Sequence, residues 1–225
     1  GRAALAAAAR TGLDAAEPGT DRQLIWARHL FSVVEAPDDV AFAHGVLGGT
    51  VDVAGLAVDT DLRWSIVMAL ASRGADDGGA LIESELERDP TDIGERRAAW
   101  SRSSRPTPEA KSAAWARLNE ETDLPLATLR SVAGGFHHTG QDEVLAPYIQ
   151  PYFDALPGFW ADRSRDEALS LARGLYPDGL VGEAVLEATD RALADDDLPG
   201  PFRRILLESK DGMERAIRGR AADAG

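Results

Sequence analysis

The chain has 225 residues, and its 24 basic residues against 38 acidic ones give a formal net charge of −14. Hydrophobic residues make up 44% of the chain, enough for a core, while the negative charge repels a phosphate backbone. We therefore expect a folded protein that binds no nucleic acid. The absence of cysteine excludes disulfides, thiolate metal sites and cysteine nucleophiles. Uncharged stretches such as 64–72 are far shorter than the ~20 residues that cross a bilayer, so we expect no membrane contact and a cytoplasmic protein.

Helical periodicity recurs along the chain, with short breaks at Gly, Pro or Asp, and the strict polar/apolar alternation of strands is missing. About a dozen helices are predicted. In chain order they cover residues 2–11, 21–34, 38–47, 60–72, 78–88, 92–103, 108–120, 126–133, 141–155, 164–176 and 181–194, and a long terminal helix begins near Phe202.

The ends of several predicted helices carry capping signals. Thr107 before Pro108 is typical of an N-cap with a first-turn proline, and Ser164 with Glu167 has capping-box spacing. The helix over 60–72 is apolar on most sides, which predicts a central position covered by neighbours. Many short helices with short connections favour an all-α fold, an α-solenoid of stacked antiparallel helix hairpins similar to HEAT and armadillo superhelices. We expect one domain over residues 1–225, with a candidate flexible seam near 48–58.

The residue patterns of common catalytic sites are missing. The four histidines are His29, His44, His137 and His138, and none is followed by Glu, so the zinc-binding helix H-E-x-x-H is absent. The sequence also lacks phosphate-binding glycine loops and the G-x-S-x-G elbow of serine hydrolases. We therefore expect no catalytic, cofactor-binding or metal-binding residue in this chain.

Several segments, taken in order and spacing, carry a resemblance. They are Gly55–Trp64, Glu85–Thr91 with Gly94, Pro106–Lys111 with Trp115, Gly134–Phe136, Leu145–Tyr148 with Tyr152–Phe153, and Arg203–Arg204 with Glu208 and Arg215–Ala216. Together they resemble the C-terminal helical domain of aminopeptidase N enzymes in its actinobacterial form, which is related to the C-terminal domain of the endoplasmic-reticulum aminopeptidases.

The resemblance implies a non-catalytic domain of a larger zinc aminopeptidase. In such enzymes the zinc lies in an upstream catalytic domain, and the C-terminal domain closes over it and walls the peptide cavity. The implied partners are the catalytic domain of the same chain and peptide substrates. The alternative is a free-standing helical-repeat scaffold that binds a protein partner, and the coding sequence upstream of Gly1 would separate the two. A third interpretation, an unrecognised hydrolase, is not supported, because the sequence contains no pattern that pairs a nucleophile with a general base.

Individual residues also receive predicted roles. Trp64, Trp100 and Trp115 are expected as core or inter-helix anchors, and Arg63 is expected to bridge to a helix end or a carboxylate. Lys111 and Trp115 are i,i+4 neighbours that can stack.

Residues 134–140 are the segment with a predicted functional role. Gly134 and Gly135 are expected to end a helix, and the loop after them would then display Phe136, His137 and His138. Within the implied enzyme these three residues are the candidate substrate-channel residues. The alternative is ordinary helix capping and packing.

Overall fold

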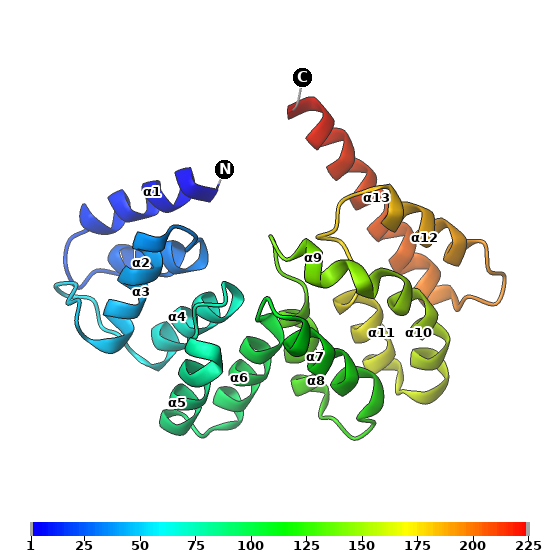
Figure 1. Ribbon diagram of the computed structural model, residues 1–225, viewed down its shortest axis with the longest axis horizontal. Coiled ribbons are helices and arrows are strands. Elements are labelled where there is room, and N and C mark those ends of the chain that lie inside the picture. The colour runs from blue at the N-terminus through cyan, green and yellow to red at the C-terminus, as the bar shows by residue number, and fades with distance from the viewer. Residues whose placement is uncertain (1, 224–225) are drawn as a thin grey trace. The chain divides into compact units, whose positions relative to one another are not determined.

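The computed structural model describes residues 2–223, in which every regular element is a helix (Figure 1). The prediction of an all-α fold is confirmed. The α-helices are α1 (Arg2–Asp14), α2 (Asp21–Ser32), α3 (Pro37–Gly48), α4 (Thr60–Ser72), α5 (Ala80–Arg88), α6 (Asp92–Ser104), α7 (Pro108–Glu120), α8 (Leu126–Phe136), α9 (Asp142–Leu145), α10 (Ile149–Asp162), α11 (Arg165–Gly174), α12 (Glu183–Leu193) and α13 (Gly200–Asp223), with short 3-10 helices η1 (Asp77–Gly79) and η2 (Ala146–Tyr148).

The capping signals in the sequence place several helix starts correctly. The hydroxyl of Thr107 accepts a hydrogen bond from the backbone N–H of Ala110 at the start of α7. Ser164 and Glu167 form the complete capping box at the start of α11. Each cap satisfies backbone N–H groups that the first helical turn leaves without partners.

The helix predicted over 141–155 is wrong in its details. The structure has α9, η2 and α10 in its place, because Pro147 lies in η2 and cannot donate a backbone hydrogen bond. The predicted end before Pro157 is wrong as well. Pro157 lies inside α10, where Leu156 and Phe159 are buried on either side of it. Burial of that apolar face outweighs the lost hydrogen bond.

The chain divides between Pro106 and Thr107 into two compact units, which we call unit 1 and unit 2. In unit 1, α1 packs on α2, and α4 contacts α2, α3, α5 and α6. Trp64 and Ile66 of α4 are completely buried, which confirms the predicted central position of this helix and the role of Trp64 as a core anchor.

The segment predicted as a flexible seam, 48–58, lies within unit 1. The side-chain amide of Gln23 joins two stretches of backbone there, because it accepts from the N–H of Gly19 at 2.9 Å and donates to the carbonyl of Ala54 at 2.8 Å. Gly55 has a φ of +79°, and a Cβ at this position would lie 2.4 Å from the nitrogen of Gly19. Only glycine fits this close approach of two loops.

In unit 2, some contacts join consecutive helices and others join helices that are separated in sequence. α7 contacts α8, α8 contacts α11, α10 contacts α11 and α12, and α13 contacts α11 and α12. The largest completely buried side chains in this unit are Tyr152, Lys111, Phe136 and Phe202. One of these four residues, Lys111, has a basic side chain, and its surroundings are described below.

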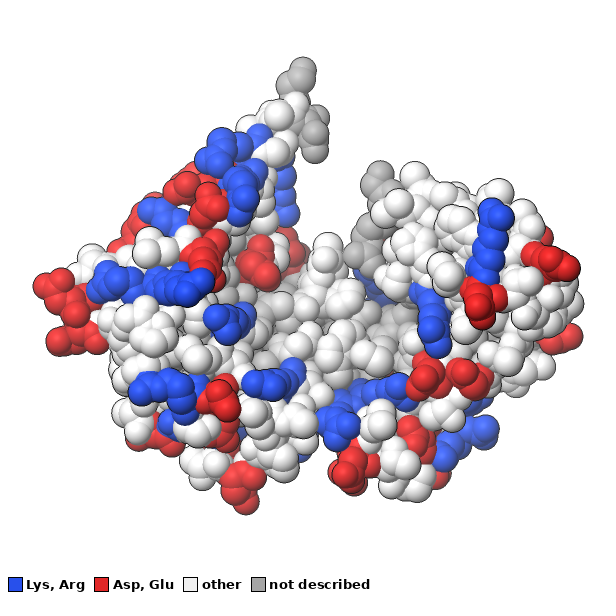
Figure 2. All heavy atoms as spheres, turned by 180° about the vertical axis from the view of Figure 1, so that it is seen from behind, with Lys and Arg blue, Asp and Glu red and all other residues white. Residues whose placement is uncertain are grey.

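Surface charges of both signs are mixed rather than segregated on α13. Figure 2 shows alternating basic and acidic side chains on this helix, and the ion pairs Arg204–Glu208, Arg215–Asp211 and Arg218–Glu214 follow i,i+4 spacing. Among the residues that the structure describes, no helix combines the length and the apolar character that a bilayer span requires.

Candidate functional site

Among the residues that the structure describes, several cationic side chains donate hydrogen bonds to carbonyl oxygens at the C-terminal ends of other helices. We call them the capping cations. Arg63 donates to Leu47 of α3, Lys111 to Phe136 of α8, Arg163 to Leu118, Asn119 and Glu121 at the end of α7, and Arg203 to Leu193 of α12 and to Asp195. The last carbonyls of a helix have no intrahelical partner and carry partial negative charge, so a cation there stabilises the helix end.

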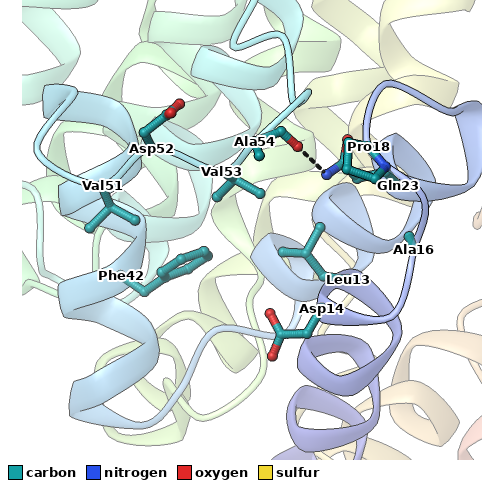
Figure 3. Close-up of a pocket in the computed structure, with 10 residues that line it drawn as sticks. All are labelled: Leu13, Asp14, Ala16, Pro18, Gln23, Phe42, Val51, Asp52, Val53 and Ala54. Carbon is teal, nitrogen blue, oxygen red and sulfur yellow. Dashed lines mark hydrogen bonds between the residues drawn. The ribbon is translucent and has the colours of Figure 1, made fainter.

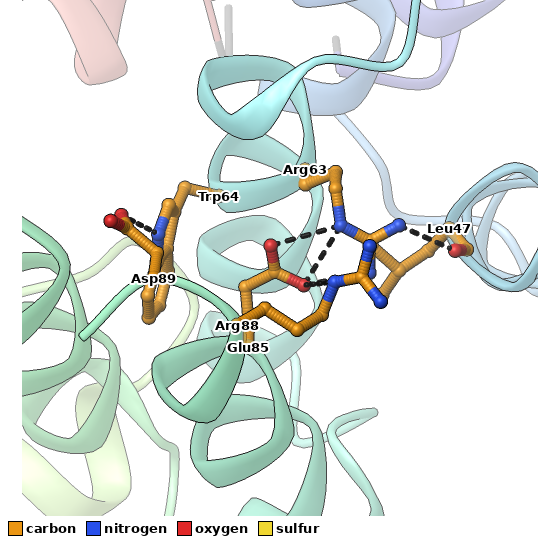
Figure 4. Close-up of polar contacts among 6 residues, drawn as sticks. All are labelled: Leu47, Arg63, Trp64, Glu85, Arg88 and Asp89. Atoms are coloured by element: carbon orange, nitrogen blue, oxygen red, sulfur yellow. Dashed lines mark hydrogen bonds and ion pairs between the residues drawn. The ribbon is translucent and has the colours of Figure 1, made fainter.

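In unit 1 the capping cation Arg63 is also ion-paired. Its guanidinium nitrogens lie 2.7–2.9 Å from the carboxylate oxygens of Glu85, and Arg88 lies 3.9 Å from the same carboxylate (Figure 4). The side chain of Glu85 is only 3% exposed and that of Arg63 19%. The prediction that Arg63 bridges to a helix end or a carboxylate is confirmed, because it does both.

Trp64, the next residue on α4, faces another carboxylate. Its indole N–H donates to Oδ2 of Asp89 at 2.8 Å (Figure 4). Hydrogen bonds from the Thr91 hydroxyl and from this indole hold the pKa of Asp89 below its usual range. The pair fixes the orientation of a large core side chain against the connection between α5 and α6.

In unit 2 the capping cation Lys111 is completely buried. Its Nζ lies 2.7 Å from the carbonyl oxygen of Phe136 and 5.5 Å from the centre of the Phe136 ring. Burial penalises the charged form of an amine, and it lowers the pKa of Lys111 from 10.5 to about 7. The amine is therefore held near the midpoint of its protonation at neutral pH.

The structure corrects the predicted display of Phe136. Helix α8 does not end at Gly134 and Gly135 but continues to Phe136, whose side chain is completely buried. Its ring packs against those of Trp115 at 5.9 Å and Tyr148 at 5.1 Å between centroids. The expected exposure of Phe136 is wrong because these distant aromatic partners, together with Lys111, favour burial over a loop position.

His137 and His138 begin the loop after α8 and are half-buried. The ring of His137 packs edge-on against Phe136, with centroids 5.1 Å apart, and its Nε2 lies 3.0 Å from the carbonyl oxygen of Leu175. His138 lies one residue further into the loop. The structure brings the three residues together at one end of α8, but with Phe136 in the core.

A pocket in unit 1 lies between the end of α1, α3 and the segment 51–54 (Figure 3), with a volume of about 330 Å³. Its lining combines apolar side chains, including Leu13 and Phe42, with the carboxylates of Asp14 and Asp52. The guanidinium of Arg10 already covers the ring of Phe42 at 3.7 Å and lies 3.8 Å from Asp14. One of the two carboxylates of this pocket, Asp14, thus already has a basic partner on its own helix.

Within residues 2–223 no three His, Asp or Glu side chains form a group that could hold a metal ion. The capping cations act on helix ends and not on a ligand. Lys111 was noticeable in the sequence because it is one of only two lysines, yet its burial depends on contacts 25 residues away and was not predicted.

This all-helical chain belongs to the ERAP1-like C-terminal domain family, whose family model matches residues 2–215. The chain is also 45% identical over 212 residues to aminopeptidase N of Streptomyces lividans. The alignment covers 94% of this chain but 25% of that protein, so the chain spans about a quarter of the relative's length. The resemblance found in the sequence is confirmed, and the chain is a peptidase-associated C-terminal domain. Arg63, Lys111 and Arg203, three of the residues that carried the resemblance, are capping cations.

Proposed function

We propose that this chain is the non-catalytic C-terminal domain of a zinc-dependent aminopeptidase, where it closes over the catalytic domain and walls the peptide-substrate cavity. The parent enzyme removes N-terminal residues from peptides. The observation that carries the proposal is the family match over residues 2–215 together with 45% identity to one quarter of a longer aminopeptidase N. Because the family match runs through both compact units, we treat them as one functional domain.

The zinc of the parent does not fit this chain. The sequence offers no thiolate, and the described residues bring no metal-binding set of His, Asp and Glu together. We place the metal, and with it every bond-breaking step, in the catalytic part of the parent. The role of this chain is to exclude water and restrict access, which a rigid wall can supply to a catalytic centre that it does not itself contain.

The capping cations suit a wall of this kind. Each one joins the end of one helix to a side chain from another part of its unit, so that the helix ends keep fixed positions. A wall that positions substrate needs such rigidity, because small displacements of a bound substrate already reduce the rate. We also propose a cytoplasmic location, which cell fractionation of the parent protein tests.

The test compares the full-length parent with a version that lacks this chain. We expect the shortened enzyme to keep turnover of a small amino-acid anilide and to lose discrimination between short and long peptides. Adding the separate 225-residue chain should restore part of that discrimination. Unchanged discrimination in the shortened enzyme contradicts the wall, and anilide turnover by the separate chain contradicts its non-catalytic role. If the shortened enzyme does not fold, the residue test below decides instead.

For the substrate channel we retain His137 and His138, since Phe136 is buried. The residue test replaces His138 by Ala in the full-length parent, with His44→Ala, in unit 1, as the control. His138 is half-buried in a loop, so we expect an altered peptide-length preference and an unchanged melting temperature of the separate chain. Identical kinetics for parent and His138→Ala would remove this residue from the channel.

A further inference from the structure

His137 joins the ends of two helices. It is the C-cap residue of α8, with an extended backbone that leaves the helix, and Leu175 is the C-cap residue of α11. The carbonyl oxygen of Leu175 can only accept, so the Nε2 of His137 carries a proton and donates it across 3.0 Å. Helices α8 and α11 approach each other closely nearby. A Cβ added to Gly174 of α11 would lie only 3.0 Å from the Cβ of Ala133 of α8. The imidazole thus connects segments that are 38 residues apart in sequence.

The other ring nitrogen of His137 has no partner. Its Nδ1 is buried and forms no hydrogen bond with the residues that the structure describes. In the neutral ring this nitrogen is an unprotonated acceptor, which costs little to leave alone. A second proton would create a buried N–H without an acceptor, and such a group costs more than a typical hydrogen bond returns.

The charged groups around the ring come from two other elements. Lys111 of α7 faces it with a positive charge, and Asp178, in the segment after α11, faces it with a negative one. Burial is the largest influence and lowers the pKa of His137 below 6.5, the hydrogen bond to Leu175 and the charge of Asp178 act in the opposite direction, and Lys111 adds to the lowering. The neutral ring is therefore the form that fits this position.

We propose that His137 is an acid-released latch. In its neutral form the ring holds residues 137–141 against the end of α11 through Leu175. In its protonated form the ring leaves the carbonyl of Leu175 for water, and the segment opens. The ring lies close to solvent along the chain, because His138 is half-buried while Thr139 and Gly140 are exposed. This inference concerns regulation and holds for the chain whether or not it walls a peptidase cavity.

The experiment measures amide hydrogen exchange in the 225-residue chain, corrected for the intrinsic effect of pH. Between about pH 7.5 and about pH 6.5 we expect constant protection of residues 137–141, and below about pH 6.5, where the released ring takes up a proton, we expect a fall of up to about tenfold per pH unit. His137→Gln keeps a donor in place of Nε2 and cannot titrate, so its protection should stay constant. His138→Gln is the matched control and should lose protection as the wild type does.

Two results would overturn the latch. One is constant protection of 137–141 in the wild type down to about pH 5.5, and the other is a loss of protection that persists in His137→Gln. Nuclear magnetic resonance titration measures the pKa of the His137 ring in the wild-type chain and tests the proposal without any variant. A ring that titrates at or above 6.5, the usual value for histidine, contradicts the proposal because the buried position would then not disfavour the protonated form.

Discussion

Arg63 in unit 1 and Lys111 in unit 2 both donate a hydrogen bond to a carbonyl oxygen at the C-terminal end of a helix. They differ in how the protein accommodates a buried basic group. Arg63 keeps its charge and meets the carboxylate of Glu85 at 2.7 Å. Lys111 lies against a carbonyl oxygen beside an aromatic ring, and its pKa falls to about 7. A guanidinium cannot lose its proton at any ordinary pH, whereas an amine can, so only the lysine makes a helix end sensitive to pH.

The largest expected effect comes from removing the ring that shields Lys111. Phe136→Ala should destabilise the chain by about 4 kcal/mol, because a completely buried aromatic side chain leaves a cavity. Water entering that cavity should also return the pKa of Lys111 toward 10.5. Chemical denaturation measures the first effect and titration of the amine the second. The control Phe42→Ala, at a half-buried ring in unit 1, should cost clearly less; equal losses would contradict the core position of Phe136.

The second effect comes from breaking the ion pair of Arg63. Glu85→Ala leaves a mostly buried guanidinium without its carboxylate and should cost about 3 kcal/mol. The matched control is Glu83→Ala on the same helix, whose pair with Arg102 is about half exposed and should contribute about 0.5 kcal/mol. Urea denaturation of the two variants side by side measures both losses. Equal losses would show that burial does not distinguish the pairs.

The third effect is a pH dependence of the free energy of unfolding, which we expect from Lys111 in unit 2 and not from Arg63 in unit 1. Above about pH 7 the unfolded state holds the Lys111 proton more tightly than the folded state does, so stability rises with pH. Between about pH 7 and about pH 9 the gain should be about 2 kcal/mol, at 1.4 kcal/mol per pKa unit. Lys111→Met should lose this gain when denaturation curves are recorded across the range.

The other lysine supplies the control with the opposite sign. A hydrogen bond to Asp190 raises the pKa of Lys210, so its contribution is complete below 10.5 and is lost as the pH rises beyond that value. Lys210→Met should therefore keep the rise in stability between neutral and moderately basic pH. If Lys111→Met and Lys210→Met show the same profile, the buried amine is not the group responsible.

The smallest effect belongs to a capping cation near the surface. Arg203→Gln should cost about 0.5–1 kcal/mol, because its hydrogen bonds to Leu193 and Asp195 compete with water. Its neighbour Arg204, which is exposed and pairs with Glu208 on the same helix, gives a control variant with a smaller loss. Thermal melts resolve the order. A loss from Arg203→Gln as large as that from Glu85→Ala would remove the distinction between buried and surface cations.

Local signals in the sequence predicted the helices well. Thr107, Pro108 and Ser164 act through hydrogen bonds within one turn, so the residues that decide these helix starts are adjacent in sequence. The central position of α4 followed from its apolar residues on most sides. Arg63 was also predicted correctly, since an arginine within an apolar helix needs an anionic or carbonyl partner.

The parts that were missed depend on contacts between distant residues. Gly134 and Gly135 are a common helix stop, yet α8 continues because Phe136 meets Trp115 and Tyr148. Nothing within a few residues of Phe136 indicates those partners. The unpartnered Nδ1 of His137 is equally invisible in the sequence, since burial of a single atom is decided by the packing of several helices.

Arg163 shows what such long connections do to folding. It precedes α11 but donates to carbonyl oxygens of Leu118, Asn119 and Glu121, 42–45 residues earlier in the chain. A stack of helix hairpins with contacts only between neighbours can unravel from its ends one hairpin at a time. In unit 2 the end of α7 cannot fray while Arg163 stays in place. The end of α7 and the start of α11, which are separated by several elements, should therefore loosen together.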